Sequence, residues 1–484
     1  MKHAEFHISY IWVALATALG AGFAIGAYLA LALGYGFPFV PAFGGLIQTH
    51  GHLQLVGWAG VFIMGVSLYF IPRLAGVPLA RPQWCTGILG LMVAGLGLRS
   101  LGQMALLVLR PPWLGLWLLT GSGFLEGCGM LLYVGLLLGT MRGLEGGRGR
   151  PALLAVRPYF GMMAGGWSVY ACLNLLLLLH MTLRHSVVVH QGWNAFAVQV
   201  FLGLVLLPVA LAFSVRTFPL YLRLAVPDWP VRGTAYAYLG AWCLHVLPTA
   251  PVVVALAPSV ARALTHLGQA CTGGILLWFV WKLDVLTHHR EPWTVRRRLH
   301  PGPERRPTRP GMPDYGEFGR FERLVYAAYV WLILGACGDL GLGTTALVGH
   351  PLPISSDAVR HLYLLGFITH LIFGMAVRMI PGFLTQRQIA SPLLVDCTWW
   401  FGTAAVVGRV LLFMMPGAAF TVLPASLWVA RTAFAWSGIL AWLAVACLAT
   451  NLWRTVSRRG RISNTGGSSS HSESGSEGSR KDAV

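Results

Sequence analysis

Charged residues are scarce in this sequence, at 11% of 484 residues. A soluble globular domain carries about 25% charged residues, so this chain cannot cover a surface that faces water. Hydrophobic residues make up 56% of the chain and the mean hydropathy is +0.65. Apolar runs long enough to cross a bilayer, about 20 residues each, recur along the sequence. We therefore expect an all-α, polytopic integral membrane protein.

Paired cysteine motifs are also missing. The eight Cys residues are dispersed, nearly all within apolar stretches, and no CxxC or CxxCH occurs. This absence argues against a disulfide framework, a zinc ribbon and covalently attached c-type haem. We interpret the dispersed Cys residues as small packing residues.

The net charge is +19, which in a soluble protein would suggest nucleic acid as a partner. Here the Arg residues lie in short loops between apolar runs, so they indicate topology instead, and membrane lipids rather than nucleic acid are the expected partners. They cluster after even-numbered runs, as in the segment 286–320. Cytoplasmic loops are enriched in Lys and Arg, so both termini are predicted to be cytoplasmic.

The apolar runs predict about twelve transmembrane helices in one membrane domain, residues 1–453. The domain includes a basic cytoplasmic loop at 286–320, and a polar tail at 454–484 is expected to be disordered. The predicted spans are 8–34, 51–72, 85–108, 113–138, 160–181, 186–214, 234–256, 260–284, 322–347, 358–381, 395–417 and 425–452.

One internal repeat joins spans two and ten. Residues 52–72 and 361–381 align without gaps and share eight identities in 21 positions, including the leading His52 and His361 and a final Ile-Pro. Both copies are predicted to run from the outer face to the cytoplasmic face. The two spans are therefore expected to be equivalent elements of a pseudosymmetric bundle.

Histidines gather near the predicted outer ends of the spans. Neutral imidazole ligates haem iron and copper, and a haem held by two His takes one ligand from each of two facing helices. His52 and His361 meet that requirement by depth and by the repeat, although an interfacial loop would also explain a His at this depth. Further candidate ligands, including those of a second metal, are His50, His190, His185 and His266. His370 is out of phase with His361 and is expected to pack in the interior.

A few charged residues fall inside the spans, where they must pair or line a polar path. Arg360, beside His361, is a candidate partner for haem propionates. Glu126 is a candidate proton conduit or the partner in a structural ion pair. The other intramembrane charges are Arg99, Asp339 and Arg409.

These residues resemble the NnrS family. His50-Gly51-His52 opening a span, followed by Gly57, Gly65 and Pro72, looks like its His-x-His signature, and His361 with Gly366 and Gly374 looks like its second His-bearing helix. The resemblance covers about 45–75 and 357–383. It implies a twelve-span protein of the bacterial inner membrane that binds b-type haem, with copper as a second candidate metal. It also implies a role in nitric oxide metabolism and denitrification, or in electron transfer from a respiratory donor.

The wider resemblance is to haem-copper oxidases and nitric oxide reductases, which place ligands on helices two, six and ten. His52, His190 and His361 match that pattern, but Tyr363 stands where helix ten of those enzymes has a second His. The full oxygen-reducing site is therefore not evident. Two alternatives stay open at this point: a catalytic oxidase or nitric oxide reductase subunit that acts on oxygen or nitric oxide, and a proton-coupled transporter without haem.

Overall fold

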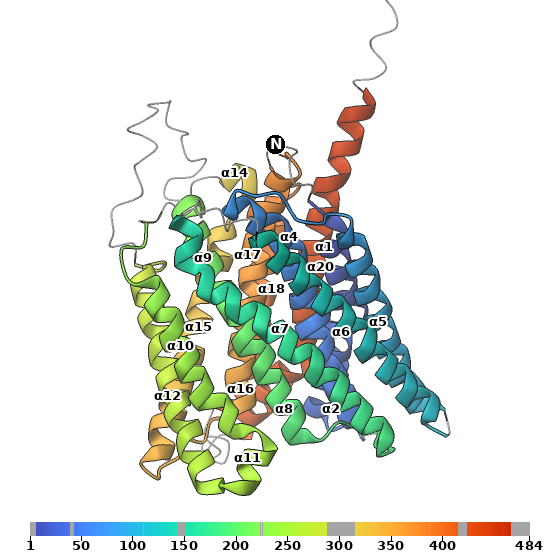
Figure 1. Ribbon diagram of the computed structural model, residues 1–484, viewed down its shortest axis with the longest axis vertical. Coiled ribbons are helices and arrows are strands. Elements are labelled where there is room, and N and C mark those ends of the chain that lie inside the picture. The colour runs from blue at the N-terminus through green and yellow to red at the C-terminus, as the bar shows by residue number, and fades with distance from the viewer. Residues whose placement is uncertain are drawn as a thin grey trace, which may run out of the picture.

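The computed structural model describes residues 6–38, 43–109, 111–142, 151–222, 224, 226–287, 315–386, 388–414 and 424–465. Every regular element in these ranges is helical, and the helices join into twelve rods that follow the predicted spans (Figure 1). The first six rods are α1–η1–α2 (Ile8–Thr17, Ala18–Gly22, Phe23–Tyr35), α3–η2–α4 (Phe43–His52, Leu53–Gly60, Val61–Ala75), α5 (Trp84–Val108), α6 (Trp113–Arg142), α7 (Pro151–Leu183) and α8–η3–α9 (Gln191–Val200, Phe201–Leu206, Leu207–Tyr221).

The second half has the same form. Its rods are α10 (Val231–Val246, continued by η4, Leu247–Thr249, and α11, Pro251–Leu256), α12 (Pro258–Leu283), α15 (Phe321–Leu347), α16–η5–α17 (Ser356–His361, Leu362–Thr369, His370–Phe383), α18 (Pro392–Met414) and α20 (Pro424–Thr465). A single turn, α14 (Tyr315–Phe318), precedes α15. Most of the predicted basic loop, residues 288–314, lies outside the described residues.

Ten of the rods in the described ranges are long and apolar enough to cross a membrane. The chain is therefore a multi-pass membrane bundle. The two remaining rods are α10, which has only 16 residues, and α18, which carries Asp396 and Arg409. For these two, the prediction of a full span stays a prediction.

The bundle has two distinct ends. The N-terminus, α14 and the C-terminal end of α20 lie at one end, and α11 and the start of α8 lie at the other (Figure 1). The rods therefore alternate in direction, which agrees with the pattern of basic loops.

The helix of α20 continues to Thr465, past residue 454 where the polar tail was predicted to begin, and residues 466–484 lie outside the described part.

Three rods form the centre of the bundle. In the best membrane-crossing window of α3–η2–α4 and of α16–η5–α17, 83% of residues are buried, and 72% are buried in α8–η3–α9. In the other candidate spans the share is 39–56%. The three rods together line an apolar cavity of about 80 Å³, to which each contributes, for example through Phe62, Phe213 and Met375. They therefore surround one common axis.

Each central rod contains a π-helical segment followed by a proline. The segments η2 and η5 begin directly after His52 and His361, and Pro72 and Pro381 each follow those histidines by 20 residues. The predicted equivalence of spans two and ten is thus visible in the backbone. Rod six repeats the pattern with η3 and Pro219, and the residue 20 positions before Pro219 is Gln199.

The repeated glycines mark equivalent helix crossings. A Cβ atom at Gly57 would lie 2.4 Å from Cγ2 of Thr17, and one at Gly366 would lie 2.6 Å from Cβ of Trp331. Rod two therefore packs closely on the rod before it, and rod ten packs on α15 in the same way. Small residues permit this close approach in membranes.

Candidate functional site

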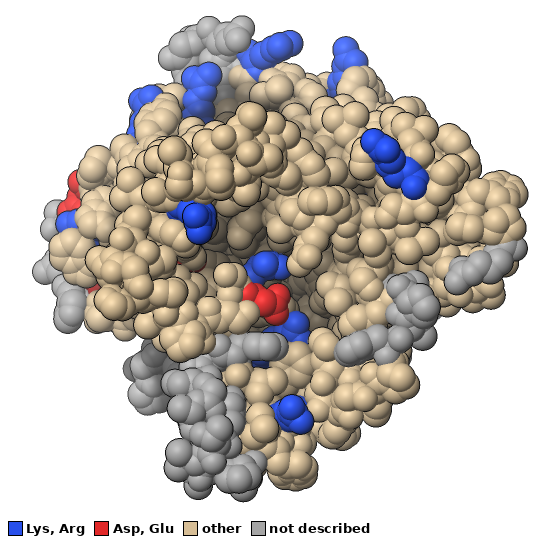
Figure 2. All heavy atoms as spheres, turned by 90° about the horizontal axis from the view of Figure 1, so that it is seen from below, with Lys and Arg blue, Asp and Glu red and all other residues tan. Residues whose placement is uncertain are grey.

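A cavity of about 410 Å³ lies around α3. Its walls come from α2, α3, η2, α5, α6, α7, α8, α16, η5, α18 and α20. Figure 2 views the bundle from the end opposite the termini and shows a hollow near the centre with an acidic side chain between basic ones. The polar lining residues include His50, His52, Gln54, Arg99, Gln103, Tyr170, Asn174, Asp357, Arg360, His361 and Arg409. Drug-sized ligands bind in cavities of about 300–1,000 Å³.

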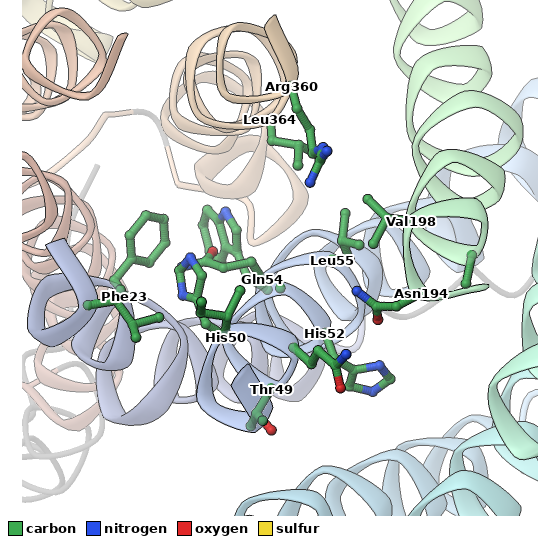
Figure 3. Close-up of a pocket in the computed structure, with 18 of the residues that line it drawn as sticks. Phe23, Thr49, His50, His52, Gln54, Leu55, Asn194, Val198, Arg360 and Leu364 are labelled. Carbon is green, nitrogen blue, oxygen red and sulfur yellow. The ribbon is translucent and has the colours of Figure 1, made fainter. Parts of the chain in front are cut away.

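His50 and His52 lie on one helix but point to opposite sides of it. Two residues correspond to about 200° around an α-helix, and Figure 3 shows His50 next to Phe23 and His52 directed away from it. Helix α3 contacts α2 on one side and α5 on the other. We call the wall nearest α2 the His50 side of the cavity and the wall nearest α5 the His52 side.

His50 has one ring nitrogen engaged. Its Nδ1 lies 2.8 Å from the carbonyl oxygen of Gly22, which only accepts, so Nδ1 carries the proton and donates it. Gly22 ends η1. The ring also fills the space above Gly26, where a Cβ atom would lie 2.5 Å from Cε1 of His50. This bond fixes the tautomer and leaves Nε2 as a lone-pair donor with no hydrogen-bond partner among the described residues.

His361 is held in the same way. Helix α16 begins after Ser355, whose side chain accepts a hydrogen bond from the backbone N–H of Asp357. One turn later, Nδ1 of His361 donates to the carbonyl oxygen of Asp357 at 2.8 Å and lies 3.3 Å from its carboxylate. Nε2 of His361 again has no partner within the described ranges. An imidazole oriented by a carbonyl or carboxylate at one nitrogen is the usual form of a metal-ligating His.

The two rings share the His50 side of the cavity with one ion cluster. His50 lies close enough to His361, Arg409 and Asp357 for electrostatic interaction with each. The Asp357 carboxylate is 3.5 Å from Arg409 and 3.7 Å from Arg360. Figure 3 shows Arg360 and Leu364 facing the cavity from the helix opposite α3. Of the predicted site residues, the structure brings together His361, Arg360 and His50, which was a further candidate ligand beside the predicted pair His52 and His361.

His52 has both ring nitrogens engaged by protein groups. Nε2 lies 2.6 Å from a carboxylate oxygen of Glu126, and Nδ1 lies 3.0 Å from the hydroxyl of Tyr170. The ring is 7% exposed and Glu126 is fully buried. This geometry therefore does not favour the predicted role of His52 as an axial ligand, because no lone pair on its ring is left for a metal.

Glu126 belongs to a buried network. Its second oxygen, Oε1, accepts from the hydroxyl of Ser122 at 2.9 Å, and Nη2 of Arg99 lies 3.9 Å from Oε2, the oxygen that His52 contacts. Arg99 in turn donates to the side-chain oxygen of Asn174 at 2.7 Å. Glu126 was predicted to be either a proton conduit or the partner in a structural ion pair. Arg99 is a partner for the ion pair. The network joins α3, α5, α6 and α7 at one depth.

Seven residues that line the cavity each carry a buried N–H group without an acceptor in the described part of the chain. The groups are Nε2 of Gln54, Nε1 of Trp58, Nε of Arg99, Nε2 of Gln103, Nδ2 of Asn174, Nε of Arg360 and Nε of Arg409. Buried polar groups are normally hydrogen-bonded, and all seven are donors.

The other predicted ligands lie away from this cavity. His185 and His190 are exposed, in the turn after α7 and at the start of α8. His266 is half-buried on α12, near His245, and its Nδ1 has no partner in the described ranges. In the ranges that the structure describes, no three or more His, Cys, Asp or Glu side chains are grouped to hold a metal ion. The predicted second metal site is thus not assembled from His185, His190 and His266.

A second buried cluster surrounds Asp339. Its carboxylate accepts from Gln269 at 2.9 Å and from the hydroxyl of Tyr363 at 2.7 Å.

His370 is fully buried, and its Nδ1 donates to the carbonyl oxygen of Leu365 in η5. The predicted interior position of His370 is thus confirmed.

Some lining residues were not found by sequence reasoning. Tyr170, Asn174 and Gln103 are single polar residues inside apolar helices, and that polarity was the available signal. Asp357 precedes His361 by four residues, a spacing that places both on one helix face.

Comparison with known proteins agrees with this fold. No protein-family model matches the chain. No curated protein sequence matches it either. Among solved structures, it is similar to a haem-copper terminal oxidase dimer determined by cryo-EM, with a TM-score of 0.61 over 92% of this chain and 84% of that chain, at 13% sequence identity. The chain therefore has a haem-copper-oxidase-like fold, as the resemblance of its His-bearing spans implied.

Proposed function

We propose that this chain is a haem-binding membrane protein whose cavity holds one b-type haem between His50 and His361. The observation that carries the proposal is the matched state of these two rings. Each donates Nδ1–H to a backbone carbonyl, at 2.8 Å in both cases, and the Nε2 of each, at the wall of one cavity, has no partner among the residues that the structure describes. The two residues come from different central rods, as two axial ligands must.

The residues around His50 and His361 fit a haem. Arg360 and Arg409 are cations on the same side of the cavity, and Nε of each is unpartnered in the described part. Guanidinium groups pair well with carboxylates such as propionates. The glycine at position 26 makes room for the His50 ring. Bound there, the group would supply a one-electron couple at iron, and the protein would hold it, orient both imidazoles and exclude water.

For the physiological role we propose nitric oxide handling or respiratory electron transfer in the bacterial inner membrane, with both termini in the cytoplasm. The support is the NnrS-like sequence around His50-Gly51-His52 and His361, together with the oxidase-like fold. A catalytic oxidase or nitric oxide reductase is the second candidate, favoured by the same fold. It requires a second metal, and turnover of oxygen or nitric oxide by the purified protein would support it.

The test is a reduced-minus-oxidised spectrum of the protein purified in detergent, with iron analysis. We expect Soret and α bands in the wild type, their loss in His50→Ala and in His361→Ala, and their retention in His52→Ala. Loss of the bands in His52→Ala with retention in His50→Ala would show that the ligand is misassigned. A wild-type protein without haem or iron would refute the proposal as a whole.

A further inference from the structure

Asp339 is a buried carboxyl group that no basic side chain of the described residues neutralises. It lies on α15 and is 6% exposed. Its two oxygens accept hydrogen bonds from neutral groups, the amide of Gln269 at 2.9 Å and the hydroxyl of Tyr363 at 2.7 Å. The ion pairs in the described ranges join other carboxylates to Arg or His. Because a charge taken out of water costs several kcal/mol unless it is paired, this carboxyl must be neutralised in another way.

Two close helix crossings gather histidines around Asp339. A Cβ atom at Gly268 of α12 would overlap the backbone nitrogen of His245 on α10. One at Gly343 of α15 would lie 2.5 Å from the carbonyl oxygen of His266 on α12. His245 lies close enough to both Asp339 and His266 for electrostatic interaction with each. Three titratable side chains therefore lie together where α10, α12 and α15 cross.

The other titratable groups near Asp339 are phenols and a thiol. Tyr238 of α10 and Tyr363 of η5 each interact electrostatically with Asp339, and Cys337 lies near Tyr363. Phenol and thiol groups are ordinarily neutral at pH 7, so proton exchange here falls to Asp339 and the two histidines. No hydrogen bond joins His245 to Asp339 within the described part of the chain, and the two direct contacts of the carboxyl are neutral. The carboxyl itself is thus the favoured place for a proton.

The direct partners of Asp339 can serve either protonation state. In the carboxylate, Oδ1 accepts from the NH₂ group of Gln269. An amide also carries an acceptor oxygen, so after a flip Gln269 accepts from a protonated Asp339, while Tyr363 continues to donate to Oδ2. A hard cation needs oxygen ligands, whereas Gln269 directs its N–H toward this site. The contacts therefore favour a proton over a metal cation.

The cluster lies in the half of the bundle away from the termini. Helix α11 lies at that end, and α12 begins next to it (Figure 1). His266 is eight residues after the start of α12, and Asp339 is eight residues before the end of α15, so both lie about 12 Å from that end. His245 is one residue from the end of α10, and both histidines are half-buried. The two imidazoles therefore lie between Asp339 and the aqueous phase.

We propose that Asp339 binds a proton and exchanges it, through His245 and His266, with the aqueous phase at the end of the bundle opposite the termini. In uptake, an O–H bond forms at Oδ1 while a hydronium ion or a neighbouring imidazolium gives up its proton. Release reverses this step, and no electron moves. The inference involves neither His50 nor His361, so it does not depend on the proposed haem.

Protonation of Asp339 is tested with dicyclohexylcarbodiimide, an apolar reagent that modifies carboxyl groups in their protonated form. The full-length protein in lipid nanodiscs is treated across a pH series, and the modified residues are located by peptide mass spectrometry. We expect modification of Asp339 at a rate that falls about tenfold for each pH unit above the midpoint of its titration. Glu126 is the internal control. It is also fully buried, but it lies 3.9 Å from Arg99, so it should stay a carboxylate and remain unmodified.

The exchange route is tested by infrared spectroscopy. The C=O stretch of a protonated carboxyl group should be present in the wild type, shift when deuterium oxide replaces water, and be absent in Asp339→Asn. The rate of this exchange should fall about tenfold or more in His245→Leu and in His266→Leu. It should be unchanged in His190→Leu, a control at the same end of the bundle.

Three outcomes would overturn the inference. The first is no modification of Asp339 at any pH, together with no carboxylic acid band that Asp339→Asn removes. The second is protection of Asp339 by sodium chloride but not by choline chloride, which would indicate a cation site. The third is an equal exchange rate in all three His variants. If Asp339→Asn fails to fold, the modification of the wild type decides.

Discussion

Arg99 and Glu126 form an ion pair whose contribution to stability can be measured. Both side chains are buried, and their charged atoms are 3.9 Å apart. At an effective dielectric constant of about 20, two unit charges at this distance attract by about 4 kcal/mol. Removing one partner of a buried pair leaves an uncompensated charge and costs about 3–5 kcal/mol. We therefore expect Glu126→Gln and Arg99→Met each to lower the free energy of unfolding by about 3 kcal/mol.

The double variant is the informative one. If the loss in each single variant comes from the stranded charge, Arg99→Met combined with Glu126→Gln should recover most of it, with a coupling energy of about 2–3 kcal/mol. Unfolding by sodium dodecyl sulfate in mixed micelles, followed by circular dichroism, measures the stability of the wild type, the two single variants and the double variant, which together form a double-mutant cycle. Additive losses in the double variant would refute the reasoning, because they would mean that Arg99 and Glu126 act through separate contacts, such as those with Asn174 and His52.

Other predictions concern packing, redox tuning and topology. Gly366→Ala should destabilise the bundle by about 1–3 kcal/mol through overpacking against Trp331, whereas Gly382→Ala, with nothing within 4 Å of the added atom, should not; the same unfolding titration compares them. Asp357→Asn removes a negative charge beside His361, so the reduction potential of the proposed haem should rise by tens of millivolts in a spectroelectrochemical titration, and an unchanged or lower value would contradict the assigned ligand. A reporter that is active only in the cytoplasm should be active when it is fused to the C-terminus, and a reporter that is active only outside the cytoplasm should be inactive there.

The architecture was largely predictable because it follows from local composition. Apolar length predicted the rods, and the position of basic loops predicted their alternating direction, since both properties are read residue by residue. The repeat at 52–72 and 361–381 predicted two equivalent rods, and their matching π segments agree with it. The third copy in rod six was missed because Gln199 replaces the leading His and its glycines are displaced, so that little sequence identity remains.

The sequence predicted the depth of the site residues in the membrane but not the direction of their side chains. Depth follows from position along a helix, and it predicted His50 and His52 in one layer with His361. The direction in which each ring points depends on partners from other helices, namely Gly22 for His50 and both Glu126 and Tyr170 for His52. No periodicity within α3 contains that information, so the choice between the two histidines needed the packed bundle.

The arrangement of the three central rods explains why the matched repeat positions do not form the ligand pair. The equivalent residues His52 and His361 do not meet, because their rings have partners on different helices. His361 lines the cavity together with His50, whereas the ring of His52 bonds Glu126 of α6 and Tyr170 of α7. The residue of rod two that meets His361 must lie on its other face, and His50, about 200° away, does so.

The equivalent positions of the central rods also predict how many haems one chain can hold. On rod six, the position equivalent to His50 is two residues before Gln199, which is Ala197, and Ala197 lines the cavity. A second site between rods two and six would therefore have His52, already bonded to Glu126 and Tyr170, opposite a side chain without a lone pair. We expect one haem per chain by pyridine haemochrome assay against protein determined by amino-acid analysis. A ratio of two would mean that His52 gives up its bonds to Glu126 and Tyr170 to bind a second haem.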